Sequence, residues 1–223
     1  MQVAGADWTM PSADGWDNSN MAMYSGDFET MGRVERLHWE RAMQLKVKRV
    51  VMGECGHAYR GAVYDGPRWL GWTKPPIPMV HAVEYYYELL TSGRLKIARK
   101  IEEPVTVQDP CNIVRGRGLH DKLRYVVNAL CEDFRDMEPR FEHNYCCQAG
   151  GGLINCGPPW KLSRMKSNKV KAEQIADTGA HIVITPCHNC HSGIEDIIGY
   201  YKLGAHVAFI SELLVKTIEM PEA

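Results

Sequence analysis

Five of the eight cysteines in this 223-residue chain form a pattern suited to a metal centre. They are Cys111, the adjacent pair Cys146 and Cys147, and the Cys-x-x-Cys pair Cys187 and Cys190. A Cys-x-x-Cys pair alone is typical of zinc sites, redox dithiols and iron–sulfur sites alike. Two adjacent cysteines point in different directions, which suits a body of several metal atoms better than one tetrahedral ion. The pattern therefore favours an iron–sulfur cluster held by five thiolates.

The residues around these cysteines resemble the CCG motif of the heterodisulfide reductase family, in its B-type and D-type subunits, and within it most closely the C-terminal catalytic part of DsrK-type proteins. Two stretches carry the resemblance, Cys146-Cys147-Gln148-Ala149-Gly150-Gly151-Gly152 and Pro186-Cys187-His188-Asn189-Cys190-His191. The sequence departs from the family pattern in two places. Gln148 stands where the family has glycine, and the gap between Cys147 and Cys187 is a few residues longer. Neither departure removes a ligand.

The resemblance implies that all five cysteines ligate a non-cubane [4Fe-4S] cluster through which a sulfur–sulfur bond is reduced. It implies a catalytic subunit of a membrane complex of dissimilatory sulfur metabolism, cytoplasmic and peripheral to the inner face of the membrane. Membrane subunits resembling DsrM would supply the electrons. The substrate would be the small protein DsrC carrying a trisulfide, or a small disulfide.

Two other interpretations of the same cysteines remain open. One is an electron-transfer iron–sulfur subunit similar to the CCG-containing subunits of glycolate or glycerol-3-phosphate dehydrogenases. The other is a non-catalytic module whose metal is structural zinc, which would be colourless. No glycine-rich dinucleotide fingerprint follows a predicted strand, so neither NAD nor a flavin is expected on this chain.

The bulk composition is that of a soluble globular protein, with 45% hydrophobic and 24% charged residues. The net charge of −1 argues against nucleic acid as the main partner. No apolar window is long enough to predict a membrane span. The N-terminus does not read as a secretory signal, so the cysteines are expected to be reduced thiols that bind metal rather than disulfides.

Short β-branched runs alternate with helical periodicity, which predicts an α/β fold with a mostly parallel sheet. Cys111 and Cys187 each follow a predicted strand, at the sheet edge where ligand sites of open α/β folds gather. Strands are predicted over 48–52, 104–108, 181–185 and 207–210. Helices are predicted over 33–45, 81–90, 119–131, 163–177 (capped by Ser163) and 192–203, with a last one capped by Ser211. Residues 1–31 and 60–79 are predicted loops.

An internal repeat predicts two pseudo-repeated α/β subdomains. Residues 1–95 would be a degenerate, cysteine-poor copy of residues 143–219, and residues 104–223 would form the CCG domain. Cys55 would take the place of Cys190. Because the first copy has no counterpart of residues 104–142, the chain is expected to be truncated at its N-terminus. The ferredoxin-like domain of the family would then lie upstream or on another chain.

Several further residues are predicted to lie beside the cluster without ligating it. The triple glycine would let the backbone approach the cluster, and nearby basic residues would offset its charge or form an ordinary solvated face. The histidines could donate a proton to a departing thiolate, although a structural hydrogen bond is the stronger interpretation for each. The predicted neighbours are Cys55, His57, His81, Arg115, Gly150, Gly151, His188 and His191. Cys131 is predicted to be a core residue, and Cys156 to lie near the glycine loop.

Overall fold

The computed structural model describes residues 1–11, 15 and 20–220. Its strands form two parallel sheets. The first pairs β1 (Val50–Met52) with β2 (Met79–His81), and the second has the order β3 (Val105–Val107), β4 (Ile182–Ile184), β5 (His206–Ala208). The predicted α/β fold with parallel strands is therefore confirmed. The expected loop over 1–31 lies partly outside the described residues, and α1 (Asn20–Ser25) and the start of α2 fall within it.

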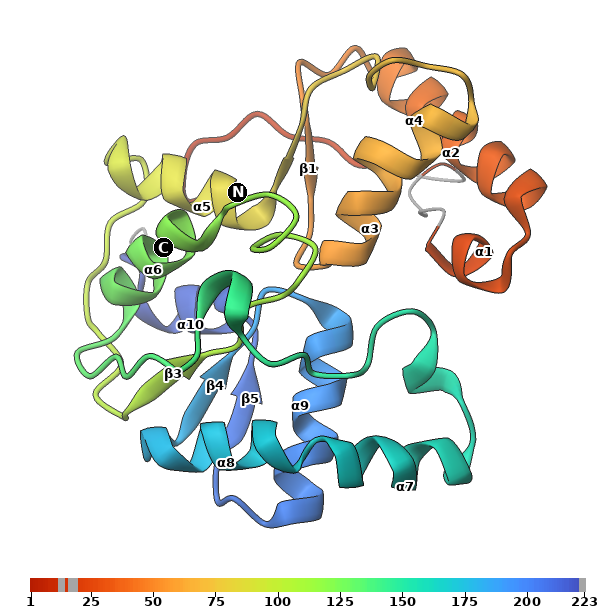
Figure 1. The fold of residues 1–223 in the computed structure, drawn as a ribbon. Helices are drawn as coiled ribbons and strands as arrows, with labels where there is room; N and C mark the ends of the chain where they lie inside the picture. Colours follow the sequence, from red (N-terminus) through yellow and green to blue (C-terminus); the bar gives the residue numbers. More distant parts are fainter. Residues whose placement is uncertain (12–14, 16–19, 221–223) are drawn as a thin grey trace.

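Helices cover both faces of the three-stranded sheet (Figure 1). On the central strand β4, Ile182 and Ile184 belong to one hydrophobic core and Val183 to the other, because successive side chains of a strand point to opposite faces. α6 (His120–Leu130) and α10 (Ile210–Thr217) pack in the first core, and α8 (Lys169–Thr178) and α9 (His188–Tyr201) in the second. This layering brings the carboxyl ends of β3 and β4 to one edge.

The N-terminal part shares the first of these cores. Trp39 of α2 (Phe28–Gln44) and Val83 of α5 (Ala82–Thr91) lie in the same buried cluster as Val126 and Ile210. α5 also packs against α6, while α1 to α4 form a lobe at the upper right of Figure 1. Burial of apolar side chains from both parts therefore ties them together.

The predicted loop over 60–79 is wrong at its beginning. The chain from Cys55 runs through α3 (Gly56–Arg60), a single π-helical turn (Gly61–Asp65) and α4 (Gly66–Trp69). Pro67 suggested a loop, but it stands in the first turn of α4, where a proline costs no helical hydrogen bond. The short strand β2 was also missed.

The helix predicted from Arg33 begins at Phe28, and three further predicted helix starts are wrong. Ser163 lies inside α7 (Pro158–Ser167), which begins with prolines after Gly157 and is followed by the separate helix α8. α9 begins at His188 rather than Ser192, and Phe209 rather than Ser211 caps α10. The Phe209 amide donates to the Glu212 carboxylate at 3.0 Å, the return half of a capping box. The predicted stop at Gly179 is confirmed by its left-handed φ of 60°.

The two sheets repeat one connection. β1 pairs with β2, which leads into α5, and β4 pairs with β5, which leads into α10. Cys55 is the N-cap of α3, as Cys187 is of α9. By position in its element, Cys55 therefore corresponds to Cys187 rather than to Cys190. The division into two repeated subdomains stays a prediction.

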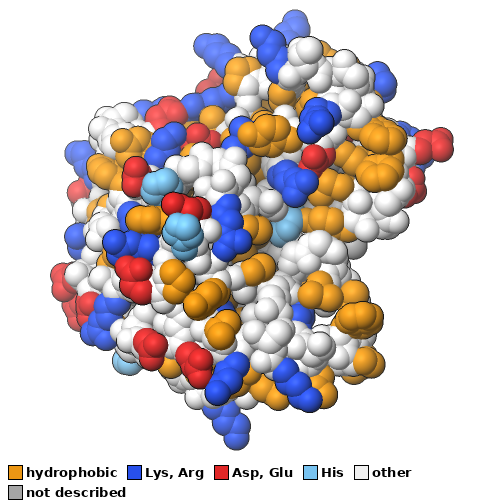
Figure 2. Space-filling model, viewed as in Figure 1, with side chains coloured by type: hydrophobic (Ala, Val, Ile, Leu, Met, Phe, Trp, Pro, Cys, Tyr) orange, Lys and Arg blue, Asp and Glu red, His pale blue; other side chains and the backbone are white. Residues whose placement is uncertain are grey.

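The surface carries mixed charge. On the face drawn in Figure 2, basic, acidic and histidine side chains are interspersed, in line with the net charge of −1. Within the described ranges, none of the helices combines the length and apolar character needed to cross a bilayer.

Candidate metal centre

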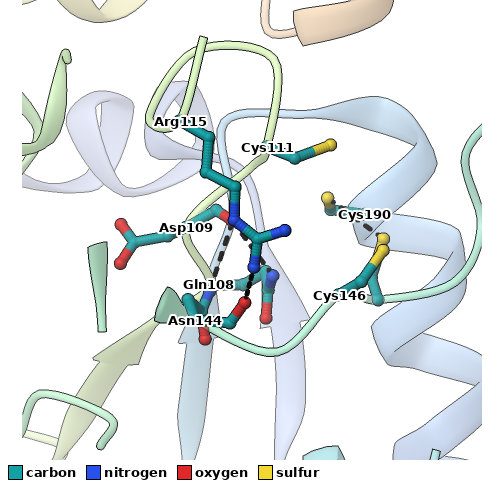
Figure 3. Close-up of a pocket in the computed structure, with 8 residues that line it drawn as sticks. Gln108, Asp109, Cys111, Arg115, Asn144, Cys146 and Cys190 are labelled. Carbon is teal, nitrogen blue, oxygen red and sulfur yellow. Dashed lines mark hydrogen bonds between the residues drawn. The ribbon is translucent and has the colours of Figure 1, made fainter. Parts of the chain in front are cut away.

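Four of the five predicted ligands line one small pocket at the carboxyl edge of the three-stranded sheet (Figure 3). The fifth, Cys187, is almost fully buried and is the N-cap of α9, three residues before Cys190. The structure therefore brings together cysteines from three segments that are far apart in the sequence. The pocket is lined by Gln108, Asp109, Cys111, Arg115, Asn144, Cys146, Cys147 and Cys190.

The thiols interact closely with one another. The sulfur atoms of Cys147 and Cys190 lie 3.2 Å apart. Hydrogen bonds from Cys146 and Cys190 lower the pKa of Cys147, and hydrogen bonds from Cys190 and Cys55 lower the pKa of Cys187. The donor thiols of Cys146, Cys190 and Cys55 correspondingly have raised pKa values. Interactions between neighbouring thiols therefore dominate the pKa shifts at the site.

The donor set fits an iron–sulfur cluster, because soft thiolates are its ligands in proteins. The side chains lie closely packed, and the pocket has room for about one water molecule. Within residues 1–11, 15 and 20–220, no group of three or more Cys, His, Asp or Glu side chains is arranged to hold a single metal ion. Loading therefore requires the cysteine side chains to separate, which rotation about χ1 permits.

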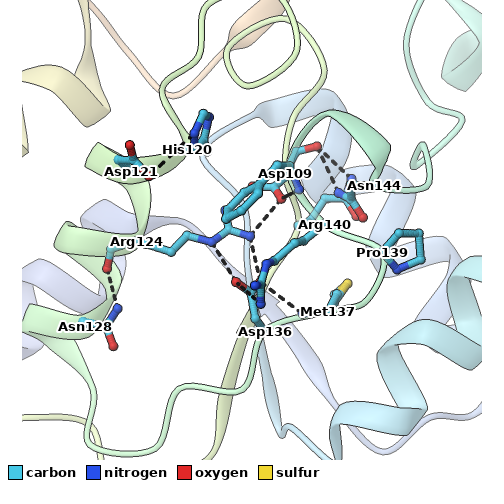
Figure 4. A network of polar contacts seen from close by, with 12 residues as sticks. Asp109, His120, Asp121, Arg124, Asn128, Asp136, Met137, Pro139, Arg140 and Asn144 are labelled. Carbon is cyan, nitrogen blue, oxygen red and sulfur yellow. Dashed lines mark hydrogen bonds and ion pairs between the residues drawn. The ribbon is translucent and has the colours of Figure 1, made fainter.

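A buried ion-pair network positions Cys111 (Figure 4). Asp109, two residues before Cys111, is 4% exposed and accepts both terminal guanidinium nitrogens of Arg124. Arg124 also donates to the Asp136 carboxylate at 2.7 and 3.1 Å. The second oxygen of Asp109 accepts the backbone amide of Phe141 at 2.8 Å. The turn that carries Cys111 is thus fixed to the segment that leads to Cys146.

Asn144 links this network to the cysteine pair. Its side-chain amide donates to the Asp109 carbonyl at 3.3 Å, and its side-chain oxygen accepts the Lys171 ammonium at 2.7 Å. Arg115 donates to the carbonyl oxygens of Glu142, at 2.6 Å, and of Asn144. Arg115 therefore lines the pocket and also holds the loop before Cys146.

The turn after the cysteine pair explains the departure at Gln148. Its φ of 52° lies in the left-handed region that favours glycine, the residue of the family pattern. Two hydrogen bonds hold it there. Its amide donates to Cys146 sulfur at 3.2 Å, and its side-chain oxygen accepts the Ser167 hydroxyl at 2.6 Å. Gly151 and Gly152 continue with φ values of 65° and 79°.

Gly150 lies against His57. A Cβ at Gly150 would lie 2.7 Å from His57 Nε2, so only glycine allows this approach. His57 Nδ1 lies 3.0 Å from the side-chain nitrogen of Asn189, and His57 acts after Cys190 and Cys55 to lower the pKa of Cys187. The N-terminal part thus supplies a nearly buried histidine to the cysteine site.

Sequence reasoning missed Gly193. A Cβ there would lie 2.7 Å from Ala149 Cβ and 3.0 Å from the Cys147 carbonyl, so glycine lets α9 pack directly on the cysteine turn. A glycine inside a helical pattern is the signal that could have found it. The sequence contains no comparable signal for the ion pairs of Arg124 or for the burial of Lys171.

His188 and His191 pack on Phe209, with ring centroids 6.3 and 4.4 Å apart and nearly parallel planes. They therefore help to join the start of α9 to the connection between β5 and α10. His81 is fully buried, and its Nδ1 accepts the Val83 amide at 3.2 Å. Its proton accordingly sits on Nε2. Burial lowers the pKa of His81 to about 4, against the opposing charge of Cys187.

The remaining cysteines stand apart from the pocket. Cys131 is 2% exposed and donates to the Val127 carbonyl at 3.1 Å, which confirms its prediction as a core residue. Cys156 is exposed and lies 3.8 Å from the Gly152 carbonyl, next to the glycine turn.

The site and its fold define a cysteine-rich domain of the CCG type, and residues 105–195 match the family model described as "Cysteine-rich domain". The chain is homologous to proteins like the D-type subunit of heterodisulfide reductase. It is 29% identical to the D-type subunit of the dihydromethanophenazine:CoB–CoM heterodisulfide reductase of Methanosarcina barkeri, over 81% of this chain and 44% of that protein.

Two further relatives belong to quinone-linked systems by name. The Hdr-like menaquinol oxidoreductase iron-sulfur subunit of Archaeoglobus profundus is 25% identical over 92% of this chain and 45% of its own length. The EtfAB:quinone oxidoreductase of Syntrophomonas wolfei is 25% identical over 78% of this chain and 24% of its own length. The chain thus spans at most about half the length of these relatives.

Proposed function

We propose that this chain is an iron–sulfur subunit, or part of one, that reduces a sulfur–sulfur bond within a membrane-associated electron-transfer complex. The observation that carries the proposal is the convergence of Cys111, Cys146, Cys147 and Cys190 on one pocket, with Cys187 buried at the N-cap of α9, the helix of Cys190. The five cysteines would hold a non-cubane [4Fe-4S] cluster. When bound, this group would deliver electrons to a sulfur–sulfur bond.

The site has an outer and an inner side. Cys146 is exposed and Cys111 half-buried, whereas Cys147, Cys187 and Cys190 are at most 4% exposed. A substrate sulfur would therefore approach past Cys111 and Cys146. The buried cysteines, together with Gly193 and His57, would exclude water from the inner side and hold the site in shape.

The substrate and partners belong to the same proposal. The substrate is a DsrC-type protein trisulfide or a small heterodisulfide, and DsrM-like membrane subunits supply the electrons. The chain would lie on the cytoplasmic face of the membrane, attached through these subunits. Support comes from the relatives, two of which are named for quinone or menaquinol oxidoreduction and one for heterodisulfide reduction.

A second candidate is electron transfer without a sulfur substrate. The relative named for electron-transfer flavoprotein and quinone oxidoreduction is consistent with such a role.

The deciding experiment is anaerobic reconstitution followed by iron and sulfide analysis, electron paramagnetic resonance and a reductase assay. We expect about four iron and four sulfide per chain. Reduction of a protein trisulfide or disulfide should proceed with a strong artificial donor or the partner complex, and not with NAD(P)H alone. A clustered protein that reduces no sulfur–sulfur bond would favour the second candidate. A colourless protein that binds zinc would refute both.

A further inference from the structure

Lys171 on α8 is a fully buried cation, with an exposed fraction of 0%. Its ammonium donates to the side-chain oxygens of Asn144, at 2.7 Å, and Gln174, and lies 3.7 Å from the sulfur of Met137. All three partners are neutral. Among the residues that the structure describes, no carboxylate forms a salt bridge with it. A buried charge without a partner of opposite sign is strongly unfavourable, so this lysine requires another source of negative charge.

The cysteine site supplies that charge. The groups whose negative charge, when they are ionised, acts on Lys171 are Cys147 first, followed by Cys190, Asp109 and Cys146. Asp109 forms no salt bridge with Lys171, and it shares the one guanidinium of Arg124 with Asp136. The cysteine site is therefore the main source of balancing charge, and Asn144, which accepts the Lys171 ammonium and lines the pocket with the cysteines, joins the two.

Burial and the cysteines have opposite effects on this lysine. Burial lowers the pKa of Lys171 to about 7, and the negative charge of the cysteines raises it. Any further negative charge at the cysteines favours the ammonium form, and by reciprocity the ammonium favours that charge.

We propose that Lys171 is the counter-charge of the five-cysteine centre, a positioning residue whose buried ammonium stabilises negative charge there and raises the reduction potential of the centre. The inference about the potential rests on the proposed function, whereas the inference about the thiolates does not.

The first test compares Lys171→Met with Lys169→Met in the reconstituted chain. Lys169 is on the same helix but pairs with Glu173 at the surface, with 70% of its side chain exposed. In Lys171→Met the equilibrium constant for one-electron reduction should fall about tenfold, which moves the midpoint potential about 59 mV lower. Lys169→Met should match the wild type. Equal potentials for wild type and Lys171→Met, at equal iron content, would overturn the proposal.

The second test needs no iron and no Lys171→Met protein. The 13Cε signal of Lys171 in the 13C-lysine-labelled apo chain, assigned through Lys171→Arg, is followed against pH. Cys147→Ala should move its midpoint to lower pH by about one unit, because the group whose negative charge acts most strongly on Lys171 is lost. Cys156→Ala should leave it in place. An unmoved midpoint in Cys147→Ala refutes the counter-charge role. Failure of the wild type to bind iron would instead refute the proposed function and leave this result intact.

Discussion

The backbone amide of His188 donates to the carbonyl oxygen of Glu54 at 2.9 Å, joining the turn after β1 to the first residue of α9. The partly buried carboxylate of Glu54 extends this junction. It accepts the amides of Ile210 and Ser211 at the start of α10, both at 2.8 Å, and the Tyr86 hydroxyl at 3.2 Å. One residue of the N-terminal part thus holds two helix starts next to the cysteine site.

Glu54→Ala should lower the free energy of unfolding by about 2 kcal/mol, because it leaves two partly buried amide donors without an acceptor. Urea denaturation of the apo chain measures this. The exposed Glu195 on α9 provides the control, and Glu195→Ala should change the stability little. Equal stability of the two variants would show that Glu54 does not join the two parts.

Gly193→Ala should destabilise the chain by about 2 kcal/mol through overpacking against Ala149 and the Cys147 carbonyl. The amount of iron that this variant retains after anaerobic reconstitution should fall together with its stability. Gly199→Ala on the same helix is the matched control, because its added Cβ meets nothing within 4 Å. That variant should gain about 0.5–1 kcal/mol from helix propensity. Thermal unfolding and iron analysis of both proteins make the comparison.

Arg124→Met leaves the buried carboxylate of Asp109 without its cation and should lower the free energy of unfolding by about 3–5 kcal/mol. Because Asp109 fixes the turn before Cys111, iron content should also fall. Arg60→Met removes an ion pair with Asp65 in which the Arg60 side chain is 52% exposed, and should lose about 0–1 kcal/mol. Chemical denaturation measures the free energy of unfolding of both variants. Comparable losses of stability in the two would argue against a positioning role for Arg124.

His81→Asn should make the apo chain less sensitive to acid. The pKa of His81 in the folded chain is about 4, below its ordinary value of 6.5. Its neutral form therefore contributes stability that is fully present above pH 6.5 and is lost as the pH falls towards 4, about 3 kcal/mol in all. Asparagine can still cap α5 but does not titrate. Between pH 7 and pH 4, the free energy of unfolding from denaturation curves should fall more steeply in the wild type than in His81→Asn. An equal fall in the two proteins would contradict this prediction.

Cys187→Ala should lose the bound iron, whereas Cys131→Ala, which removes an equally buried thiol in the core, should keep it. Both variants remove one sulfur atom, so a difference between them reports on ligation and not on packing. Iron and acid-labile sulfide per chain are the measurement. Equal loss in both would show that iron uptake follows stability alone.

The regular elements and the cysteines were predictable because their signals are local. Ile182 to Ile184 form a β-branched run that is buried on both faces, as its composition indicated. The turn through α3 and α4 was not predicted, because its glycines and Pro67 resemble a loop until tertiary packing selects the helical form. Lys171 was not predicted either, since a lysine on a helix is usually exposed. Only the spatial meeting of α8 with the cysteine turn explains its burial.

The order in which the ligands occur along the chain constrains how the centre can be assembled. The pairs Cys146–Cys147 and Cys187–Cys190 are each local, but helices α7 and α8 separate one pair from the other, and α6 separates Cys111 from both. Bringing them together requires the non-local parallel pairing of β3 with β4, a contact type that forms late in folding. An emerging chain could therefore hold metal only at the local pairs. A complete cluster would therefore be inserted only after β3 and β4 have paired. A protein that delivers the cluster would then meet the site on its exposed side, where Cys146 lies.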